Sequence, residues 1–254
     1  MAKKMKTAAK RGATSRATAA KTARAPKPAV APGELRTLRD LVRYAVSRCN
    51  AAHVVFAHGT TDPVAEAVFL VCEALHLHPD QFDLFADARV TASEAKAVLA
   101  LIERRIATRK PAAYLVNKVY MRGLPFYVDE RVIVPRSYFA ELLEDGFSPW
   151  VAEPAAVGRA LDLCTGSGCL AILLAQVFPA AQVDAIDISP EALAVAHRNI
   201  ADYGLEDRVR AIESDLFAAV PDARYDLIIS NPPYVTAAAM AALPAEYRHD
   251  PALA

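Results

Sequence analysis

Hydrophobic residues recur at helical spacing in three segments of residues 34–110. Residues 35–49 place their apolar side chains on one helical face, and residues 63–77 repeat the pattern. Thr91 or Ser93 can cap a third helix with a similar apolar face. The pattern therefore predicts a small helical domain in this part of the chain.

The pattern changes from helical spacing to alternation at residues 118–134. This stretch, "VYMRGLPFYVDERVIVP", is rich in β-branched and aromatic residues and has a glycine at its turn, which predicts a hairpin. A short helix is predicted over residues 137–144. We assign residues 111–158 to the hairpin and a linker.

From residue 159 onward, short apolar runs alternate with helical patterns. Four predicted strands contain "ALDLC", "QVDAIDI", "RVRAIESD" and "YDLIIS". Alternating β and α units predict an α/β fold over residues 159–254, a Rossmann-like parallel sheet with helices on both faces. In such folds ligands bind at the carboxyl ends of the strands.

The composition is that of a globular protein with one large or two small domains. The chain has 254 residues, of which 54% are hydrophobic, and no apolar run reaches the roughly 18 residues of a membrane span. No signal-peptide pattern is present. The four cysteines lack metal-ligand spacing and a disulfide framework, so we expect a cytoplasmic protein with no metal and no membrane contact.

The net charge of zero conceals two regions of opposite charge. Residues 1–33 contain nine of the 29 Lys and Arg residues and no acid, whereas all 29 Asp and Glu residues follow. Such a composition predicts a disordered basic tail. Three interpretations remain open: a loose tether that contacts RNA weakly, a solvated extension, or a transit peptide.

The first predicted strand ends in "DLCTGSG", residues 162–168. Gly166 and Gly168 permit a close backbone approach to a ligand at a helix N-terminus. Asp162 would repel a pyrophosphate but suits the ammonium group of a bound amino acid, which favours S-adenosyl-L-methionine (SAM) over NAD. A tight structural turn is the alternative interpretation.

The next two strands also end in acidic residues. Asp187 can accept hydrogen bonds from both hydroxyls of a ribose. Asp215 can accept from the amino group of adenine, with Leu216 or Phe217 beside the ring. Asp187 can alternatively be a capping or solvent-facing acid, and Asp215 can be one of the acids that commonly follow a strand.

The fourth strand ends in "NPPYV", residues 231–235. Pro232 and Pro233 stiffen the loop and hold the Asn231 side chain and the Pro232 carbonyl as two rigid acceptors, and Tyr234 supplies a flat wall. Two acceptors and a ring suit a planar –NH2 group. Because both N–H hydrogens are then taken up, the nitrogen lone pair can turn towards an electrophile.

These strand ends resemble those of Rossmann-like SAM-dependent methyltransferases that methylate planar nitrogens. The order of a helical domain, "FYVDERVIVPRS" (126–137), "LDLCTGSG" and "NPPY" resembles the HemK/Prm family of protein-(glutamine-N(5)) methyltransferases. Within that family, "VPRSYFAEL" and "LPAEYRHDPALA" resemble the PrmB branch, which methylates a glutamine of the large-subunit ribosomal protein L-three.

The resemblance implies roles for individual residues. Asn231, Pro232 and Tyr234 would be catalytic. The substrate glutamine would contact Asn231, Pro232, Pro233, Tyr234 and Arg136, although Arg136 can instead be a structural salt-bridge partner. The helical domain would recognise the substrate. SAM would contact Asp162, Cys164, Thr165, Gly166, Ser167, Gly168, Asp187, Asp215, Leu216 and Asn231.

The resemblance also sets two expectations for the C-terminal part. The family fold has seven strands and only four are predicted here, so we expect a chain truncated at its C-terminus, with three strands missing and its activity in doubt. Two alternative functions remain: an adenine amino-methyltransferase, which would need a basic and aromatic substrate face, and an inactive fragment acting as a binding module.

Overall fold

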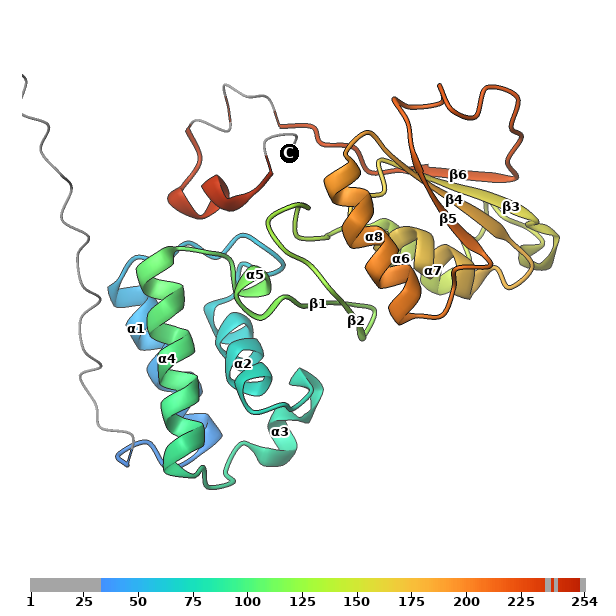
Figure 1. The fold of residues 1–254 in the computed structure, drawn as a ribbon. Coiled ribbons are helices and arrows are strands. Elements are labelled where there is room, and N and C mark those ends of the chain that lie inside the picture. The colour runs from blue at the N-terminus through green and yellow to red at the C-terminus, as the bar shows by residue number, and fades with distance from the viewer. Residues whose placement is uncertain (1–32, 236–238, 240–241, 252–254) are drawn as a thin grey trace, which may run out of the picture.

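A helical part and a parallel sheet are joined by a short hairpin (Figure 1). The computed structural model describes residues 33–235, 239 and 242–251. The predicted basic tail, apart from Gly33, lies outside the described residues. Among the described residues, no helix is both long and apolar enough to cross a membrane.

The helical part contains the three predicted helices and three shorter ones. Thr91, and not Ser93, caps the third long helix; its side chain accepts from the backbone N–H of Glu94 in a capping box. The shorter helices have too few residues for a periodic signal. The elements are α1 (Leu38–Ala51), α2 (Pro63–Ala74), η1 (Pro79–Gln81), α3 (Phe82–Phe85), α4 (Ala92–Thr108) and α5 (Ala112–Val116).

One apolar cluster holds the three long helices together. Leu41 of α1, Val71 of α2, and Val98 and Ile102 of α4 have no exposed surface. They occupy the helical faces that the apolar spacing predicts. This cluster is separate from the one that packs against the sheet.

The predicted hairpin is present but shorter than expected. Strands β1 (Val119–Met121) and β2 (Leu124–Phe126) pair antiparallel. Beyond β2, the backbone N–H of Tyr127 donates to Asn199 Oδ1 at 2.8 Å, and the Tyr127 carbonyl accepts from Asn199 Nδ2 at 3.0 Å. Because this side chain takes the place of a partner strand, the prediction of a hairpin continuing to residue 134 is wrong.

Short helical turns then lead to the sheet. The predicted helix over residues 137–144 is present as α6 (Phe139–Leu142) followed by η2 (Leu143–Asp145). The turn η3 (Pro154–Ala156) comes directly before the first strand of the sheet.

The four predicted strands form one parallel sheet in the order β5-β4-β3-β6. The chain runs from β3 through β4 to β5 and then returns to place β6 on the other side of β3. Loops therefore diverge at the carboxyl end of β3, the position at which parallel sheets bind ligands. The elements are β3 (Arg159–Leu163), α7 (Cys169–Val177), β4 (Gln182–Asp187), α8 (Pro190–Asp202), β5 (Val209–Glu213), β6 (Leu227–Ser230) and η4 (Ala245–His249).

The two helices between strands pack against the same face of the sheet. Right-handed crossovers from β3 to β4 and from β4 to β5 move in one direction, so α7 and α8 share a face. The return to β6 crosses the other face through residues 214–226, which form turns and no helix. The prediction of helices on both faces is therefore wrong for the described residues.

Candidate active site

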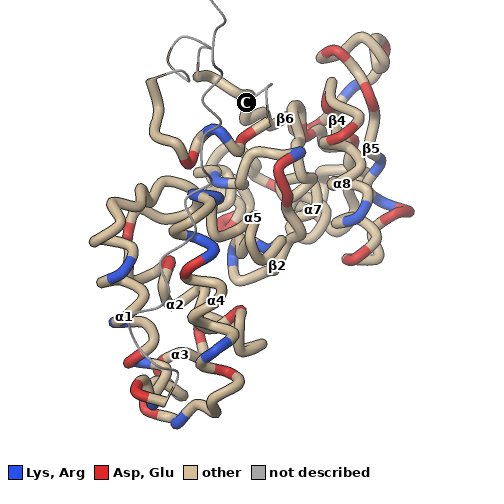
Figure 2. Tube along the Cα trace, turned by 60° about the vertical axis from the view of Figure 1, so that its left-hand side comes forward, with Lys and Arg blue, Asp and Glu red and all other residues tan. Residues whose placement is uncertain are grey.

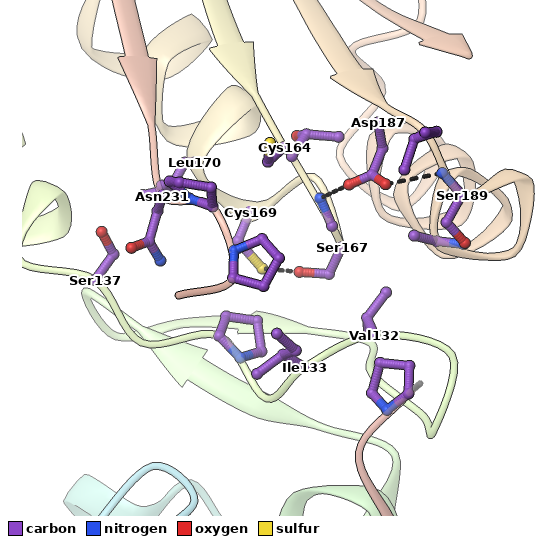
Figure 3. Close-up of a pocket in the computed structure, with 18 of the residues that line it drawn as sticks. Val132, Ile133, Ser137, Cys164, Ser167, Cys169, Leu170, Asp187, Ser189 and Asn231 are labelled. Atoms are coloured by element: carbon purple, nitrogen blue, oxygen red, sulfur yellow. Dashed lines mark hydrogen bonds between the residues drawn. The ribbon is translucent and has the colours of Figure 1, made fainter. Parts of the chain in front are cut away.

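A cavity of about 390 Å³ lies at the carboxyl ends of the strands (Figure 3). On the sheet side, the segments 163–167, 186–189, 214–216 and 231–235 line it. Residues 131–137 form the opposite wall. The four strand ends that the sequence singled out are thus brought together around one space.

The glycine turn after β3 has a backbone that few residues adopt. Gly166 and Gly168 have φ angles of +56° and +78°. A Cβ on Gly168 would also approach the Ala196 Cβ of α8 to 3.1 Å. Gly166 lines the cavity and Gly168 does not, so the first glycine opens the turn to a ligand and the second allows α7 and α8 to pack closely.

Asp162 lies under this turn and does not line the cavity. Its Oδ2 accepts from Thr165 Oγ1 at 2.6 Å and from the Ala171 backbone N–H at 3.0 Å. Its Oδ1 has no hydrogen-bond partner among the described residues, and burial raises the pKa of the carboxyl to about 6. We therefore assign Asp162 a positioning role, in place of the predicted contact with a cofactor.

Asp187 at the end of β4 both fixes the turn and faces the cavity. Its Oδ2 accepts from the Gly166 N–H at 2.8 Å and its Oδ1 from the Ser189 N–H at 3.0 Å, as Figure 3 shows. Each carboxylate oxygen has a further lone pair. The two oxygens can therefore also accept from two neighbouring hydroxyls of a ligand.

The end of β5 contributes a more open part of the cavity. Asp215 and Leu216 line it, and Leu216 has a φ of +49° and is about half exposed. Phe217, the alternative neighbour of an adenine ring, does not line the cavity. Leu216 is therefore the apolar residue on this side.

Asn231 after β6 is held in one orientation by the opposite wall. Its Nδ2 donates to the backbone carbonyl of Arg136 at 3.3 Å, which leaves its Oδ1 as an acceptor. Pro232, Pro233 and Tyr234 follow along the cavity, and the Tyr234 side chain is exposed. The predicted pair of acceptors and the flat wall therefore lie on one edge of the cavity.

The two hydrogen bonds described for Arg136 hold parts of the protein together. Its carbonyl orients Asn231, while its guanidinium Nη1 donates to the Ala57 carbonyl of the helical part at 3.0 Å. The partner of the guanidinium is thus a carbonyl, and no salt bridge of Arg136 is formed with the residues that the structure describes. Arg136 links the cavity wall to the helical part.

Several cavity residues belong to a segment that carried the family resemblance but received no role from the sequence. Leu243, Tyr247, Asp250 and Pro251 line the cavity although they come after the "NPPY" loop. The aromatic and acidic residues of "LPAEYRHDP" could have indicated a functional segment. They have no helical or strand periodicity, so the sequence did not predict where this segment lies. Within the described ranges, no group of His, Cys, Asp and Glu could hold a metal ion.

Comparisons with known proteins agree with this architecture. The family description "Methyltransferase small domain" matches residues 150–245, and "PrmC N-terminal domain" matches residues 40–116. A relative from Bradyrhizobium diazoefficiens named ribosomal protein uL3 glutamine methyltransferase is 66% identical over 244 residues, which is 92% of this chain and 76% of the relative. The chain belongs to the uL3 glutamine methyltransferase family.

Two further relatives carry the same name. That of Bordetella pertussis is 60% identical, covering 87% of this chain and 74% of the relative; that of Burkholderia pseudomallei is 54% identical, covering 88% and 75%. The predicted resemblance to HemK/Prm methyltransferases is confirmed. Membership in the uL3 glutamine methyltransferase family makes the chain a methyltransferase with a Rossmann-like α/β fold.

Proposed function

We propose that this protein transfers a methyl group from SAM to the side-chain amide nitrogen of a glutamine in ribosomal protein uL3. The observation that carries the proposal is the orientation of Asn231. Because its Nδ2 is engaged by the Arg136 carbonyl, its Oδ1 is available to accept from a substrate amide. The names of the relatives supply the identity of the substrate protein.

The residues around the glycine turn fit SAM. Gly166 presents backbone without a side chain, the Asp187 oxygens retain lone pairs for ribose hydroxyls, and Asp215 with Leu216 offers an acceptor and an apolar contact for adenine. Cys164, Thr165 and Ser167 complete the lining of the turn. SAM, when bound, supplies an electrophilic methyl group.

The substrate side of the cavity positions a weak nucleophile. An amide nitrogen is unreactive because its lone pair is delocalised into the carbonyl. Asn231 Oδ1 and the Pro232 carbonyl can accept the two N–H hydrogens, and Tyr234 can stack against the amide plane. The nitrogen lone pair is thereby aimed at the methyl group by preorganised dipoles, and no strong general base is needed.

Charge argues against the alternative of an adenine amino-methyltransferase. All 29 acidic residues but only 20 of the 29 basic residues lie after residue 33. Figure 2 shows Lys and Arg interspersed with Asp and Glu along the described chain, whereas binding to a polyanion depends on an excess of basic residues. A protein substrate therefore suits this surface better than a nucleic acid.

The experiment combines calorimetry with methyl-group incorporation. We expect SAM to bind and NAD not to bind, and labelled methyl groups to enter purified uL3 and not DNA or RNA. Asn231→Ala should lower the rate on uL3 by roughly 100-fold or more while leaving folding intact, since one preorganised polar contact is lost. An unchanged rate in this variant would contradict the role of Asn231, and labelling of DNA would favour the alternative function.

A further inference from the structure

The segment 243–251 forms a wall of the cavity that the sequence patterns did not assign. It follows the "NPPY" loop and contains η4. Figure 1 shows η4, in red, lying beside the helical part and away from the sheet. Its residues Leu243, Tyr247, Asp250 and Pro251 contribute to the cavity lining.

Asp250 anchors this segment to two other parts of the chain. Its Oδ2 lies 3.0 Å from His58 Nε2, and its Oδ1 lies 3.1 Å from the Tyr114 hydroxyl. The side chains of Asp250 and His58 are each only 5% exposed. Tyr114 also lies 2.7 Å from the carbonyl of Val132, a residue of the opposite cavity wall.

Glu246 provides a second buried anchor, in the first turn of η4. This residue is 2% exposed, and its Oε1 accepts from the Val55 backbone N–H at 3.0 Å and from Arg109 Nη1 at 3.4 Å. Arg105 Nη1 lies 4.0 Å from the same oxygen. Buried carboxylates are costly unless paired, so these partners fix the segment in one position.

Tyr247 lies between the two anchors and faces the cavity. Its ring packs on His58 with centroids 4.6 Å apart and the planes inclined by 50°. His58 is in turn held by Asp250. Tyr247 is thus a partly buried aromatic ring, held by its neighbours, in the wall of the cavity that the "NPPY" loop also lines.

We propose that Tyr247 is a further substrate-binding residue, which packs against the chain that carries the target glutamine. This inference rests on the proposed function. Tyr247 and Tyr234 line the same cavity as Asn231, so the aliphatic stem of a glutamine side chain that reaches Asn231 can pack against a ring. Asp250 and Glu246 act as positioning residues, because their carboxylates are engaged by other parts of the chain and hold the segment that carries Tyr247.

Steady-state kinetics on purified uL3 test the contact. Tyr247→Ala should raise the KM for uL3 by about tenfold, the loss of one aromatic contact, while the chain stays folded and the Kd for SAM stays unchanged. Tyr247→Phe keeps the ring and should behave as the wild type. Tyr138→Ala is the matched control, since Tyr138 is 83% exposed and lines no part of this cavity. An unchanged KM in Tyr247→Ala overturns the proposal.

Photo-crosslinking separates this proposal from the proposed function. A benzophenone amino acid at position 247 should crosslink to uL3, whereas the same group at position 138 should not. A crosslink from position 247, with no methyl transfer by the wild type, would refute the proposed activity and support the contact between Tyr247 and uL3. Methyl transfer by the wild type, with no crosslink from position 247, would refute the contact between Tyr247 and uL3 and support the proposed activity.

Discussion

At the scale of single residues, two carboxylates at neighbouring strand ends have different roles. Asp162 at the end of β3 is fully buried and holds the turn through Thr165 and Ala171. Asp187 at the end of β4 lines the cavity and leaves lone pairs for a ligand. The first should therefore influence stability and the second cofactor affinity.

The stability of the fold should depend on pH through Asp162. Its pKa is about 6 in the folded chain against 3.8 as the ordinary value, so the folded state binds the proton more tightly. The contribution is fully present below about pH 4 and is lost as the pH rises through 6, by at most roughly 3 kcal/mol. Urea unfolding from pH 4 to 7 should show this loss relative to Asp162→Asn, whose amide does not titrate. Parallel curves for the two proteins would contradict the assignment.

Removal of the Asp187 carboxylate should weaken SAM binding. Asp187→Ala loses the acceptors for the ribose and the Gly166 contact, which should cost about 1–3 kcal/mol of binding free energy. Calorimetry measures this directly. Glu213→Ala is the matched control, because Glu213 ends β5 beside Asp187 but is exposed and does not line the cavity. Equal Kd values for both variants would show that Asp187 does not hold the cofactor.

At the scale of elements, a buried ion pair joins α2 and α4, two of the three long helices of the helical part. Arg105 of α4 donates to Glu66 of α2 at 2.8 Å, and both side chains are almost fully buried. Arg105 Nη2 also donates to the Val55 carbonyl at 3.0 Å. Because Glu246 belongs to the same cluster, the packing of α2 and α4 is linked to the position of η4.

Breaking this pair should destabilise the helical part strongly. Arg105→Met leaves Glu66 and Glu246 without their buried cation, at a cost of about 3–5 kcal/mol. The control is Arg39→Met, since the Arg39–Asp87 pair is exposed and screened by solvent, so its loss should change the stability little. Urea unfolding followed by the helical circular dichroism signal compares them. Similar midpoints would mean that the buried pair contributes no more than a surface one.

At the scale of the whole molecule, charge is divided along the chain. Nine Lys and Arg residues precede Glu34, and every acidic residue lies in the remainder. We propose that the basic residues contact ribosomal RNA without sequence preference, as screened charges do.

Deleting residues 1–32 should affect RNA affinity and not catalysis. The deletion removes all nine of these cations, so binding to ribosomal RNA should weaken and its dependence on salt should flatten. The rate on isolated uL3 should stay the same. Filter binding across a range of KCl concentrations and methyl incorporation measure the two effects. A large loss of activity on isolated uL3 would mean that these residues belong to the catalytic fold.

The sequence by itself determined the three long helices of the helical part, the four strands of the parallel sheet and the residues at the strand ends. Helix caps such as Thr91, the βα alternation and the stiff loop at Asn231 depend on residues close together in the chain, so their signals are local. Only the tertiary structure decided which polar groups face the cavity. The Asp162 side chain lies beneath the glycine turn, because Thr165 Oγ1 and the Ala171 backbone N–H donate to its carboxylate there.

The same distinction applies to the walls of the cavity. The Arg136 carbonyl, rather than its guanidinium, orients Asn231 because the guanidinium reaches Ala57. Asp250 meets His58 across 192 residues of sequence, a pairing that no local pattern encodes. Such contacts form because buried polar groups need partners, and the fold alone determines which partners are within reach.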